Sequence, residues 1–289
     1  MNFIKKLLYP FTATIGFIQN HFKAMVFVLI LFLIFAPGSE DDLRPHNLQT
    51  ISLIGPIMDA TEVVKQIDDA TEDSAIKGVL FNVNSPGGAV APSIEIAYAI
   101  KRLQETKPVV VYASGTIASG SYYASIWADE IMVNPGSMVG SIGVIMQGAN
   151  VSELMGKIGI KTQTVSAGKY KQVGTSDREW TTDEKAELNK VIQGTYDLFT
   201  NDVASARGLD IKKRDTYANA HIFTAAQAKE VGLIDSVGVA YDAKAQLVKL
   251  SEVSEPVWNK EDKFEKFMKQ FGAQSASLVH LYFPSISMY

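Results

Sequence analysis

Short apolar runs that resemble β-strands alternate with helix-like segments from Leu48 to about Leu250, and this alternation limits the possible folds more than any other feature. β-Branched and aromatic residues dominate three runs, Thr50–Ile54, Gly78–Val83 and Pro108–Ala113, as is typical of strands. A helical stripe of apolar residues over Ala91–Thr106 lies between the last two runs. Alternation of this kind predicts an α/β domain with largely buried strands.

Capping signals predict where other helices begin. Three pairs of residues have the required spacing: Asp59 with Glu62, Thr181 with Glu184, and Thr224 with Gln227. We expect these helices to end near three positions, Ala70, Arg207 and Gly232. A further short strand is expected at Lys161–Ser166.

The N-terminal region combines positive charge with an apolar stretch. No Asp or Glu occurs from Met1 to Ser39, and the apolar residues 24–36 are followed by Pro37 and Gly38 and then by the acidic residues Glu40, Asp41 and Asp42. As a helix this stretch spans only roughly 20 Å of a ~30 Å hydrocarbon core, and the flanking Phe22 and Lys23 can lengthen it. The charge asymmetry predicts a cytoplasmic N-terminus and an extracytoplasmic domain.

We therefore expect a retained signal-anchor that crosses the inner (cytoplasmic) membrane once. A cleaved signal peptide is the alternative, but the proline in Ala36-Pro37-Gly38 and the long preceding segment count against cleavage. The expected regions are a cytoplasmic N-terminus (1–23), a transmembrane anchor (24–36), a linker (37–47), the main domain (48–250) and a C-terminal extension (251–289).

Composition excludes several kinds of site. The chain has no cysteine, which excludes disulfides, thiolate metal sites and a cysteine nucleophile. A formal net charge of -4, with no dominant basic stripe, gives no reason to expect a nucleic-acid partner. We expect neither a metal ion nor a cofactor.

A turn rich in glycine follows the second strand-like run, in Asn84-Ser85-Pro86-Gly87-Gly88. Its backbone N–H groups face outwards without side-chain obstruction, and a helix that begins just beyond adds a favourable dipole. The turn therefore suits a developing negative charge. The alternative is an ordinary strand-to-helix turn, which is the commoner role of such residues.

A dense run of small residues, ASGTIASGSYYAS, follows the third strand-like run. Ser119 lies here between Ala118 and Gly120, where its hydroxyl would be sterically free at the start of a helix. A nucleophile next to an N–H that stabilises the oxyanion is a recurring arrangement in acyl transfer. The alternative is a simple helix N-cap. Three nearby serines are rival candidates: Ser114, Ser121 and Ser125.

A nucleophilic serine needs a base, and the histidines are poorly placed to supply one. The four are His21 before the apolar stretch, His46 in the linker, His221 before a short strand-like pair, and His280 near the end. A lysine is the alternative base where burial keeps its amine neutral. Lys169 and Lys171 lie in a glycine-bounded loop, Gly168–Gly174, although such lysines are more often solvated surface charges.

Five motifs, taken in order, resemble the signal peptide peptidase A family: NSPGG, ASGSYYAS, GSMVGSIGV, GKYKQVGTSDRE and IFTAAQAKEVGLID. The similarity covers the region from about Leu48 to Leu250, and the predicted anchor fits it. The resemblance implies a serine peptidase with a Ser–Lys dyad. It also implies an α/β fold of the ClpP/crotonase-like kind, built from repeated β-β-α units and preceded by one transmembrane helix.

The resemblance assigns roles to individual residues. Ser119 matches the family nucleophile and Lys171 the general base, with Lys169 as a nearby residue that does not match. Ser141 matches a serine that hydrogen-bonds the lysine amine and orients it. One departure is Ser121, which stands where a second glycine is common.

The resemblance also implies the oxyanion hole and the assembly. The amide of Gly120 matches one half of the oxyanion hole and the Gly87-Gly88 turn the other, without deciding which of these two glycines donates. In this family neighbouring subunits contribute the serine and the lysine of one site, so we expect a homo-oligomeric ring that cleaves remnant signal peptides.

Two other functions fit the same fold. An acyl-CoA enzyme of the crotonase type also uses an oxyanion hole, but an anchored, exported domain would lie away from coenzyme A. A non-catalytic membrane-bound scaffold would be expected if Ser119 or Lys171 were absent, and both are present.

Overall fold

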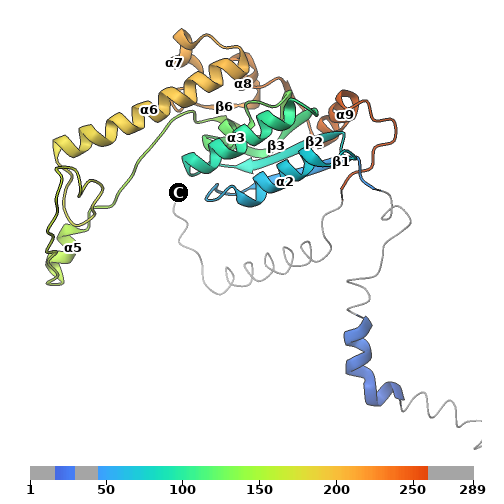
Figure 1. Ribbon diagram of the computed structural model, residues 1–289, viewed down its shortest axis with the longest axis horizontal. Helices are drawn as coiled ribbons and strands as arrows, with labels where there is room; N and C mark the ends of the chain where they lie inside the picture. The colour runs from blue at the N-terminus through green and yellow to red at the C-terminus, as the bar shows by residue number, and fades with distance from the viewer. Residues whose placement is uncertain (1–16, 30–44, 260–289) are drawn as a thin grey trace, which may run out of the picture. The chain divides into compact units, whose positions relative to one another are not determined.

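A mostly parallel sheet forms the centre of the computed structural model, which describes residues 17–29 and 45–259. Five strands lie side by side in the order β1-β2-β3-β4-β7, and each neighbouring pair is parallel. Figure 1 labels the first three of these strands. The strands of the sheet are β1 (Leu48–Ile54), β2 (Gly78–Ser85), β3 (Val109–Ala118), β4 (Glu130–Val133), β5 (Met138–Gly140), β6 (Ile222–Thr224) and β7 (Ser236–Val237).

The long strand β3 pairs with different neighbours along its length. Its first half pairs with β4, whereas Thr116–Ala118 pair with β5. β6 then pairs with β5 in the antiparallel sense. The C-terminal end of β3 is therefore held by strands that lie off the main path of the sheet.

Helices connect and cover the strands. Those of the compact unit His46–Trp258 are α2 (Thr61–Glu72), α3 (Val90–Gln104), α4 (Gly120–Ser125), α5 (Ser152–Lys157), α6 (Thr182–Arg207), the 3-10 helix Ile211–Lys213, α7 (Arg214–Tyr217), α8 (Ala225–Glu230) and α9 (Ala240–Leu250). A separate helix covers residues 17–29.

Alternate residues of the central strands enter two different cores, as the period of a strand requires. Phe81 belongs to the larger core, which includes the apolar faces of α2 and α3. Leu80 and Val110 belong to a smaller core with Leu247 of α9, against which Trp258 packs. Both faces of the sheet are thus covered, which explains why the strands read as continuous apolar runs.

The predicted α/β alternation is confirmed, and the three expected strands correspond to β1, β2 and β3. Two expected capping boxes are also confirmed. Thr181 accepts from the backbone N–H of Glu184 at the start of α6, and Thr224 makes the same contact with Gln227 at the start of α8. Gly208, with φ 64°, ends α6 in the left-handed conformation.

One local prediction is wrong, and one helix has a different cap from the one expected. Residues 161–166 form no strand, because no neighbouring strand pairs with them. The helix expected after Asp59 is present from Thr61 to Glu72, but its N-cap is Ala60. Asp59 accepts a hydrogen bond at 2.9 Å from the N–H of Thr61, the first residue of the helix, and makes no capping box with Glu62.

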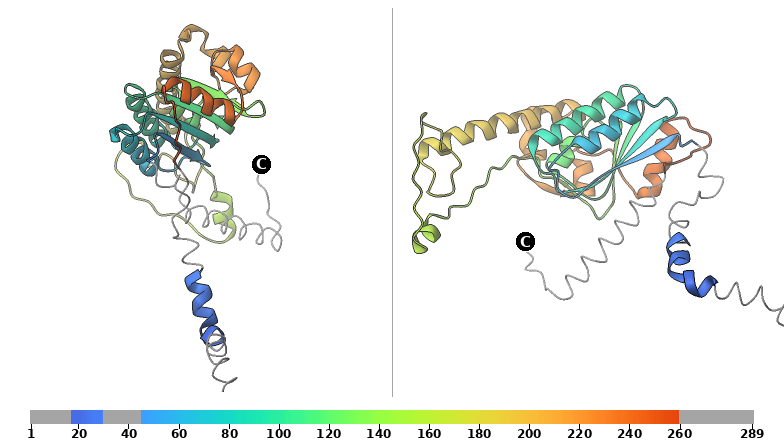
Figure 2. Two further views of the ribbon diagram at one scale, coloured as in Figure 1. Left: turned by 90° about the vertical axis from the view of Figure 1, so that its right-hand side faces the viewer. Right: turned by 60° about the horizontal axis from the view of Figure 1, so that its bottom comes forward.

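One segment, residues 143–183, contains no buried side chain. Its first residues, Gly143 and Val144, line the pocket described below, whereas the part that includes α5 lies at the N-terminal end of α6, away from the sheet (Figure 1, and in other orientations Figure 2). We call it the extended segment. Buried residues of α6 include Glu184 near its start, and then Phe199, Thr200, Val203 and Ala204 in its second half.

The predicted anchor is only partly described. None of the helices in the described ranges is long and apolar enough to cross a membrane, and residues 30–36 of the expected span lie outside those ranges. Of the expected C-terminal extension, residues 251–259 are described. Val257 accepts backbone hydrogen bonds from Asn47 and Leu48, so this part lies along the start of β1.

Candidate active site

Ser119 occupies a sharp turn between β3 and α4. Its backbone has φ 53° and ψ -123°, a sparsely populated conformation that costs a residue with a side chain about 1–3 kcal/mol. Hydrogen bonds hold the turn on both sides: the Ser119 N–H donates to the Gly140 carbonyl at 2.8 Å, and its carbonyl accepts from Tyr123 N at 3.0 Å. A strained strand-to-helix turn of this kind is typical of an exposed nucleophile.

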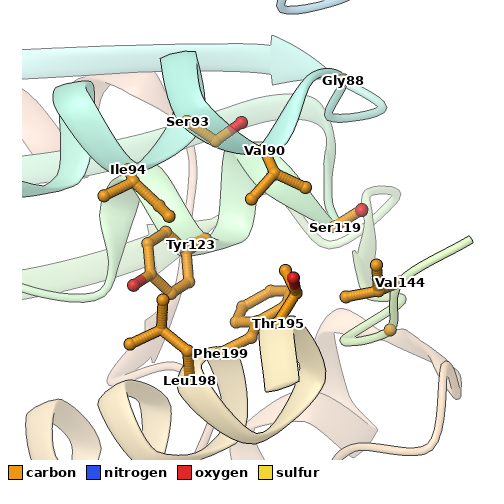
Figure 3. A pocket seen from close by; sticks show the side chains of 12 residues that line it. Gly88, Val90, Ser93, Ile94, Ser119, Tyr123, Val144, Thr195, Leu198 and Phe199 are labelled. Carbon is orange, nitrogen blue, oxygen red and sulfur yellow. The ribbon is translucent and has the colours of Figure 1, made fainter. Parts of the chain in front are cut away.

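The hydroxyl of Ser119 is free to react. Ser119 stands at the N-cap position of α4, but its side chain makes no capping hydrogen bond, so the simple N-cap interpretation does not explain it. No hydrogen-bond partner of this hydroxyl occurs within residues 17–29 and 45–259. Figure 3 shows the side chain at the rim of a pocket.

The hydroxyls of the three rival serines contact backbone carbonyls instead. Ser121 and Ser125 are fully buried, and their hydroxyls bond to backbone carbonyls. Ser114 lies earlier on β3, and its hydroxyl contacts the Val83 carbonyl at 3.4 Å. Among these four serines, only Ser119 lines the pocket.

Glycine is required at position 87 because two turns approach each other there. Gly87 has φ 94°, and a Cβ on it would lie 2.6 Å from the backbone nitrogen of Gly120 and 2.9 Å from Ser119 Cβ. A Cβ on Gly120 would lie 2.2 Å from the side-chain oxygen of Ser93 and 3.3 Å from the backbone nitrogen of Gly88. The turn after β2 and the turn after β3 are therefore in direct contact.

Two backbone N–H groups remain unpaired at this contact. Ile57 pairs with both flanks of Gly88: its N–H donates to Gly87 O at 2.9 Å, and its carbonyl accepts from Ala89 N at 2.7 Å. Gly87 N–H donates to Ser85 Oγ at 3.2 Å. In the part of the chain that the structure describes, no acceptor occupies the N–H of Gly88 or Gly120. Of the two glycines that the sequence left undecided, Gly88 is thus the one with a free donor.

An apolar pocket lies beside Ser119. Its walls come from three helices, with Ile94 on α3, Tyr123 on α4 and Phe199 on α6 among the lining side chains (Figure 3). The rings of Tyr123 and Phe199 meet edge to face, with centroids 4.8 Å apart. Burial raises the pKa of the Tyr123 hydroxyl, as does its hydrogen bond to Asp202, so the hydroxyl stays protonated and donates to that carboxylate.

Ser141 lies one residue beyond the carbonyl that holds the Ser119 turn. It follows β5, has φ 50°, and donates its N–H to the carbonyl of His221 at 2.7 Å. The imidazole of His221 is exposed and stacks loosely with Phe223, with ring centroids 6.0 Å apart. His221 therefore contributes to this region through its backbone.

Lys171 lies elsewhere in the same chain. It belongs to the extended segment, its side chain is exposed, and it does not line the pocket. Lys169 pairs with Asp183 at 2.7 Å, and this hydrogen bond raises the pKa of the lysine. No ion pair on Lys171 occurs within the described ranges. One chain therefore brings together Ser119, both oxyanion candidates and Ser141, but not Lys171.

Sequence reasoning missed the contribution of α6 to the pocket. Thr195, Leu198 and Phe199 line it, although they are far from Ser119 along the chain. Together with the buried Val203, these residues have the spacing of one face of a helix. This periodic pattern in the sequence could have identified them.

Comparisons with known proteins agree with the motifs. Residues 101–254 match the profile of peptidase family S49. A protein of Methanocaldococcus jannaschii named as a candidate protease is 43% identical over 198 residues, which are 68% of this chain and 64% of the relative. The chloroplastic serine protease SPPA of Arabidopsis thaliana is 32% identical over 189 residues, 65% of this chain and 28% of the relative. The matched region thus spans less than two thirds of either relative.

Among solved structures, a ClpP1 mutant from Listeria monocytogenes is 17% identical, with a TM-score of 0.47 over 67% of this chain and 93% of that chain. The family assignment rests on the sequence matches, which cover the Ser119 turn, Ser141 and Lys171. The chain belongs to peptidase family S49, the family of signal peptide peptidase A.

Proposed function

We propose that the chain is a membrane-anchored serine endopeptidase that hydrolyses remnant signal peptides and other short, unfolded apolar peptides. The observation that carries this proposal is the strained Ser119, whose unpartnered hydroxyl lies beside the two unpaired N–H groups of Gly88 and Gly120. A free nucleophile beside two free donors is what acyl transfer requires.

The reaction proceeds through an acyl-enzyme. Lys171 accepts the proton of Ser119 as the hydroxyl oxygen attacks the peptide carbonyl, and the N–H groups of Gly88 and Gly120 stabilise the resulting oxyanion. When the C–N bond breaks, the lysine returns the proton to the leaving amine. Water, deprotonated by the same lysine, then hydrolyses the ester and regenerates Ser119.

The base is supplied by a neighbouring subunit, so the active form is a ring of identical chains. Two features of the extended segment support this. Its Lys171 does not reach the pocket of its own chain, and its apolar side chains are unusually exposed, with Ile145 82% and Leu154 59% exposed. Contact with a second copy would bury these side chains and withdraw the lysine from water, which favours a neutral amine. Ser141 of the receiving subunit would then orient that amine.

The substrate class follows from the pocket and from the predicted anchor. The walls beside Ser119 are mainly apolar, which favours small or apolar side chains next to the scissile bond. The predicted signal-anchor, residues 24–36, would hold the domain on the extracytoplasmic side of the inner membrane, where apolar peptides leave the bilayer.

Covalent labelling tests the proposal. A fluorophosphonate should label the wild-type chain at Ser119, and peptide mapping should find the adduct on that residue alone. Ser119→Ala should abolish labelling, whereas Ser114→Ala, on the strand that leads to Ser119, should keep it. An unlabelled wild-type protein that is correctly folded and assembled would reject the peptidase and leave the non-catalytic scaffold as the better account.

A further inference from the structure

Two buried serines connect the turns that carry the unpaired N–H groups. Ser121 Oγ donates to the carbonyl of Ser85 at 2.7 Å, and Ser85 Oγ accepts from the N–H of Gly87 at 3.2 Å. Both side chains are fully buried. Ser85 ends β2 and Ser121 lies in the first turn of α4, so this pair links the two turns by side-chain hydrogen bonds.

Ser121 also contacts the residue before the nucleophile. Its hydroxyl oxygen accepts from Ala118 N at 2.9 Å and lies 2.9 Å from Ala118 O. A conformation as strained as that of Ser119 persists only where surrounding contacts over-determine it. The contacts of Ser121 fix the backbone immediately before this strained residue.

We propose that Ser121, together with Ser85, is a positioning residue that holds the N–H groups of Gly88 and Gly120 at the separation required by the oxyanion. This inference rests on the proposed peptidase function and adds to it a residue that touches neither substrate nor nucleophile. A glycine at position 121 would leave this turn flexible. The hydroxyl of Ser121 instead links the turn to the end of β2.

Loss of this hydroxyl should affect the transition state more than the ground state. Ser121→Ala removes the hydroxyl that bonds to both the N–H of Ala118 and the carbonyl of Ser85 where β2 and β3 end, so the backbone around them loses this link and can shift. The oxyanion forms only after attack, and its donors act only within hydrogen-bond range. The expected result is a lower kcat with little change in KM.

The chain offers a matched control in Ser125. It is equally buried, lies in the same helix, and donates its hydroxyl to the carbonyl of Ser121 at 2.8 Å, but it contacts neither Ala118 nor Ser85. The experiment compares Ser121→Ala with Ser125→Ala in the full-length, assembled protein. It measures kcat and KM on an apolar peptide, the rate of fluorophosphonate labelling, and the melting temperature.

We expect Ser121→Ala to lower kcat and the labelling rate about 10- to 100-fold, somewhat less than the loss of a whole oxyanion donor, with KM within about twofold. Ser125→Ala should lower the melting temperature by a similar amount but keep kcat within about twofold. Ser85→Ala, which keeps the Ser85 carbonyl and removes only the acceptor for Gly87 N–H, should lower kcat about threefold. It provides the test if Ser121→Ala does not fold.

The inference is overturned if Ser121→Ala or, in its place, Ser85→Ala is destabilised but retains wild-type kcat. Equal loss of kcat in Ser125→Ala would also overturn it, since the effect would then be general destabilisation of α4. Failure of the proposed function looks different: the assembled wild-type protein itself would then neither cleave the peptide nor react with the fluorophosphonate.

Discussion

Ser119 lies between a buried strand and a fully buried helix, whereas Lys171 lies in a segment of the same chain in which no side chain is buried. The first residue has a defined, strained backbone that its own chain holds through Gly140, Ser121 and the turn at Gly87. The second has no contact with the pocket that it would serve. Under the proposed mechanism, the comparison means that the nucleophile and the oxyanion donors are pre-organised within one chain, while the proposed base depends on assembly.

The largest expected effect comes from removing either member of the proposed dyad. Ser119→Ala and Lys171→Ala should each lower kcat/KM by about 10⁴-fold or more, and the double variant should be hardly worse, because the two residues act as a unit. Lys169→Ala is the matched control, since Lys169 lies two residues away and pairs with Asp183. Peptide hydrolysis by each purified variant measures this. Loss in Lys169→Ala with activity retained in Lys171→Ala would transfer the role of base to Lys169.

A methyl group at position 87 tests the pre-organised region alone. Gly87→Ala should lower kcat about 10²- to 10³-fold, because the added Cβ would lie 2.6 Å from Gly120 N and displace an oxyanion donor. Gly136→Ala is the control, since the nearest atom to its Cβ would be 3.5 Å away. Both variants should assemble like wild type in size-exclusion chromatography. Normal kcat in Gly87→Ala would show that the close contact of the two turns is not needed.

Ser141 tests the connection between the two regions. Ser141→Ala should lower kcat about 10-fold, the worth of one orienting hydrogen bond, which is less than the loss of either dyad residue. Its pH–rate profile should also shift, because the lysine amine loses a hydrogen bond that helps to set its protonation. Rates of peptide hydrolysis across pH measure both effects. A profile that coincides with wild type at every pH would remove Ser141 from this role.

The smallest effect is expected where the extended segment joins α6. Arg178 donates two hydrogen bonds to the buried carboxylate of Glu184, at 2.8 and 2.6 Å, and Thr181 N–H donates a third at 2.8 Å. These contacts lower the pKa of Glu184 to about 2 from the usual 4.5. A depressed carboxyl pKa stabilises the folded state above the unfolded value, and this contribution is lost as the pH falls through the folded value.

Protection of the α6 N-terminus from hydrogen exchange should therefore weaken as the pH falls from about 4.5 to about 2. These limits are the usual pKa of a glutamate and the lowered pKa of Glu184 in the folded protein. Glu184→Gln should remove this pH dependence and lower kcat only about twofold at neutral pH, a few tenths of a kcal/mol. Hydrogen exchange at the N–H groups of Thr181, Glu184 and Lys185 measures the first effect. An unchanged acid response in Glu184→Gln would assign it to another group.

The sequence predicted those parts of the fold that local chemistry determines. Strands β1 to β3 follow from β-branched runs, and α6 begins where Thr181 and Glu184 form their capping box. Residues 161–166 have similar β propensity but no strand beside them, and propensity without a neighbour does not make a strand. The N-cap of α2 is Ala60 rather than Asp59, although the Asp59 side chain accepts from the N–H of Thr61, the first residue of the helix.

The candidate site was predictable only in part, because some of its features depend on contacts between segments that are distant in the sequence. Ser119 and the glycines each stand in a short motif whose backbone geometry is local, and the family resemblance assigned their expected roles. Gly88 could be separated from Gly87 only once the partners Ile57 and Ser85 were known. The roles of α6 and of Ser121 depend on contacts between distant segments, which spacing along the chain does not encode.

Mixing two inactive variants tests most directly whether the dyad is formed between subunits. Ser119→Ala supplies only Lys171, and Lys171→Ala supplies only Ser119, so a ring that contains both should include complete sites. Co-expressed at equal amounts and randomly mixed, they should recover about a quarter of wild-type activity, since each site needs one specified neighbour. Ser119→Ala mixed with the double variant should remain inactive, because no nucleophile is present. Mixed rings that are verified by native mass spectrometry and yet hydrolyse no peptide would contradict the account.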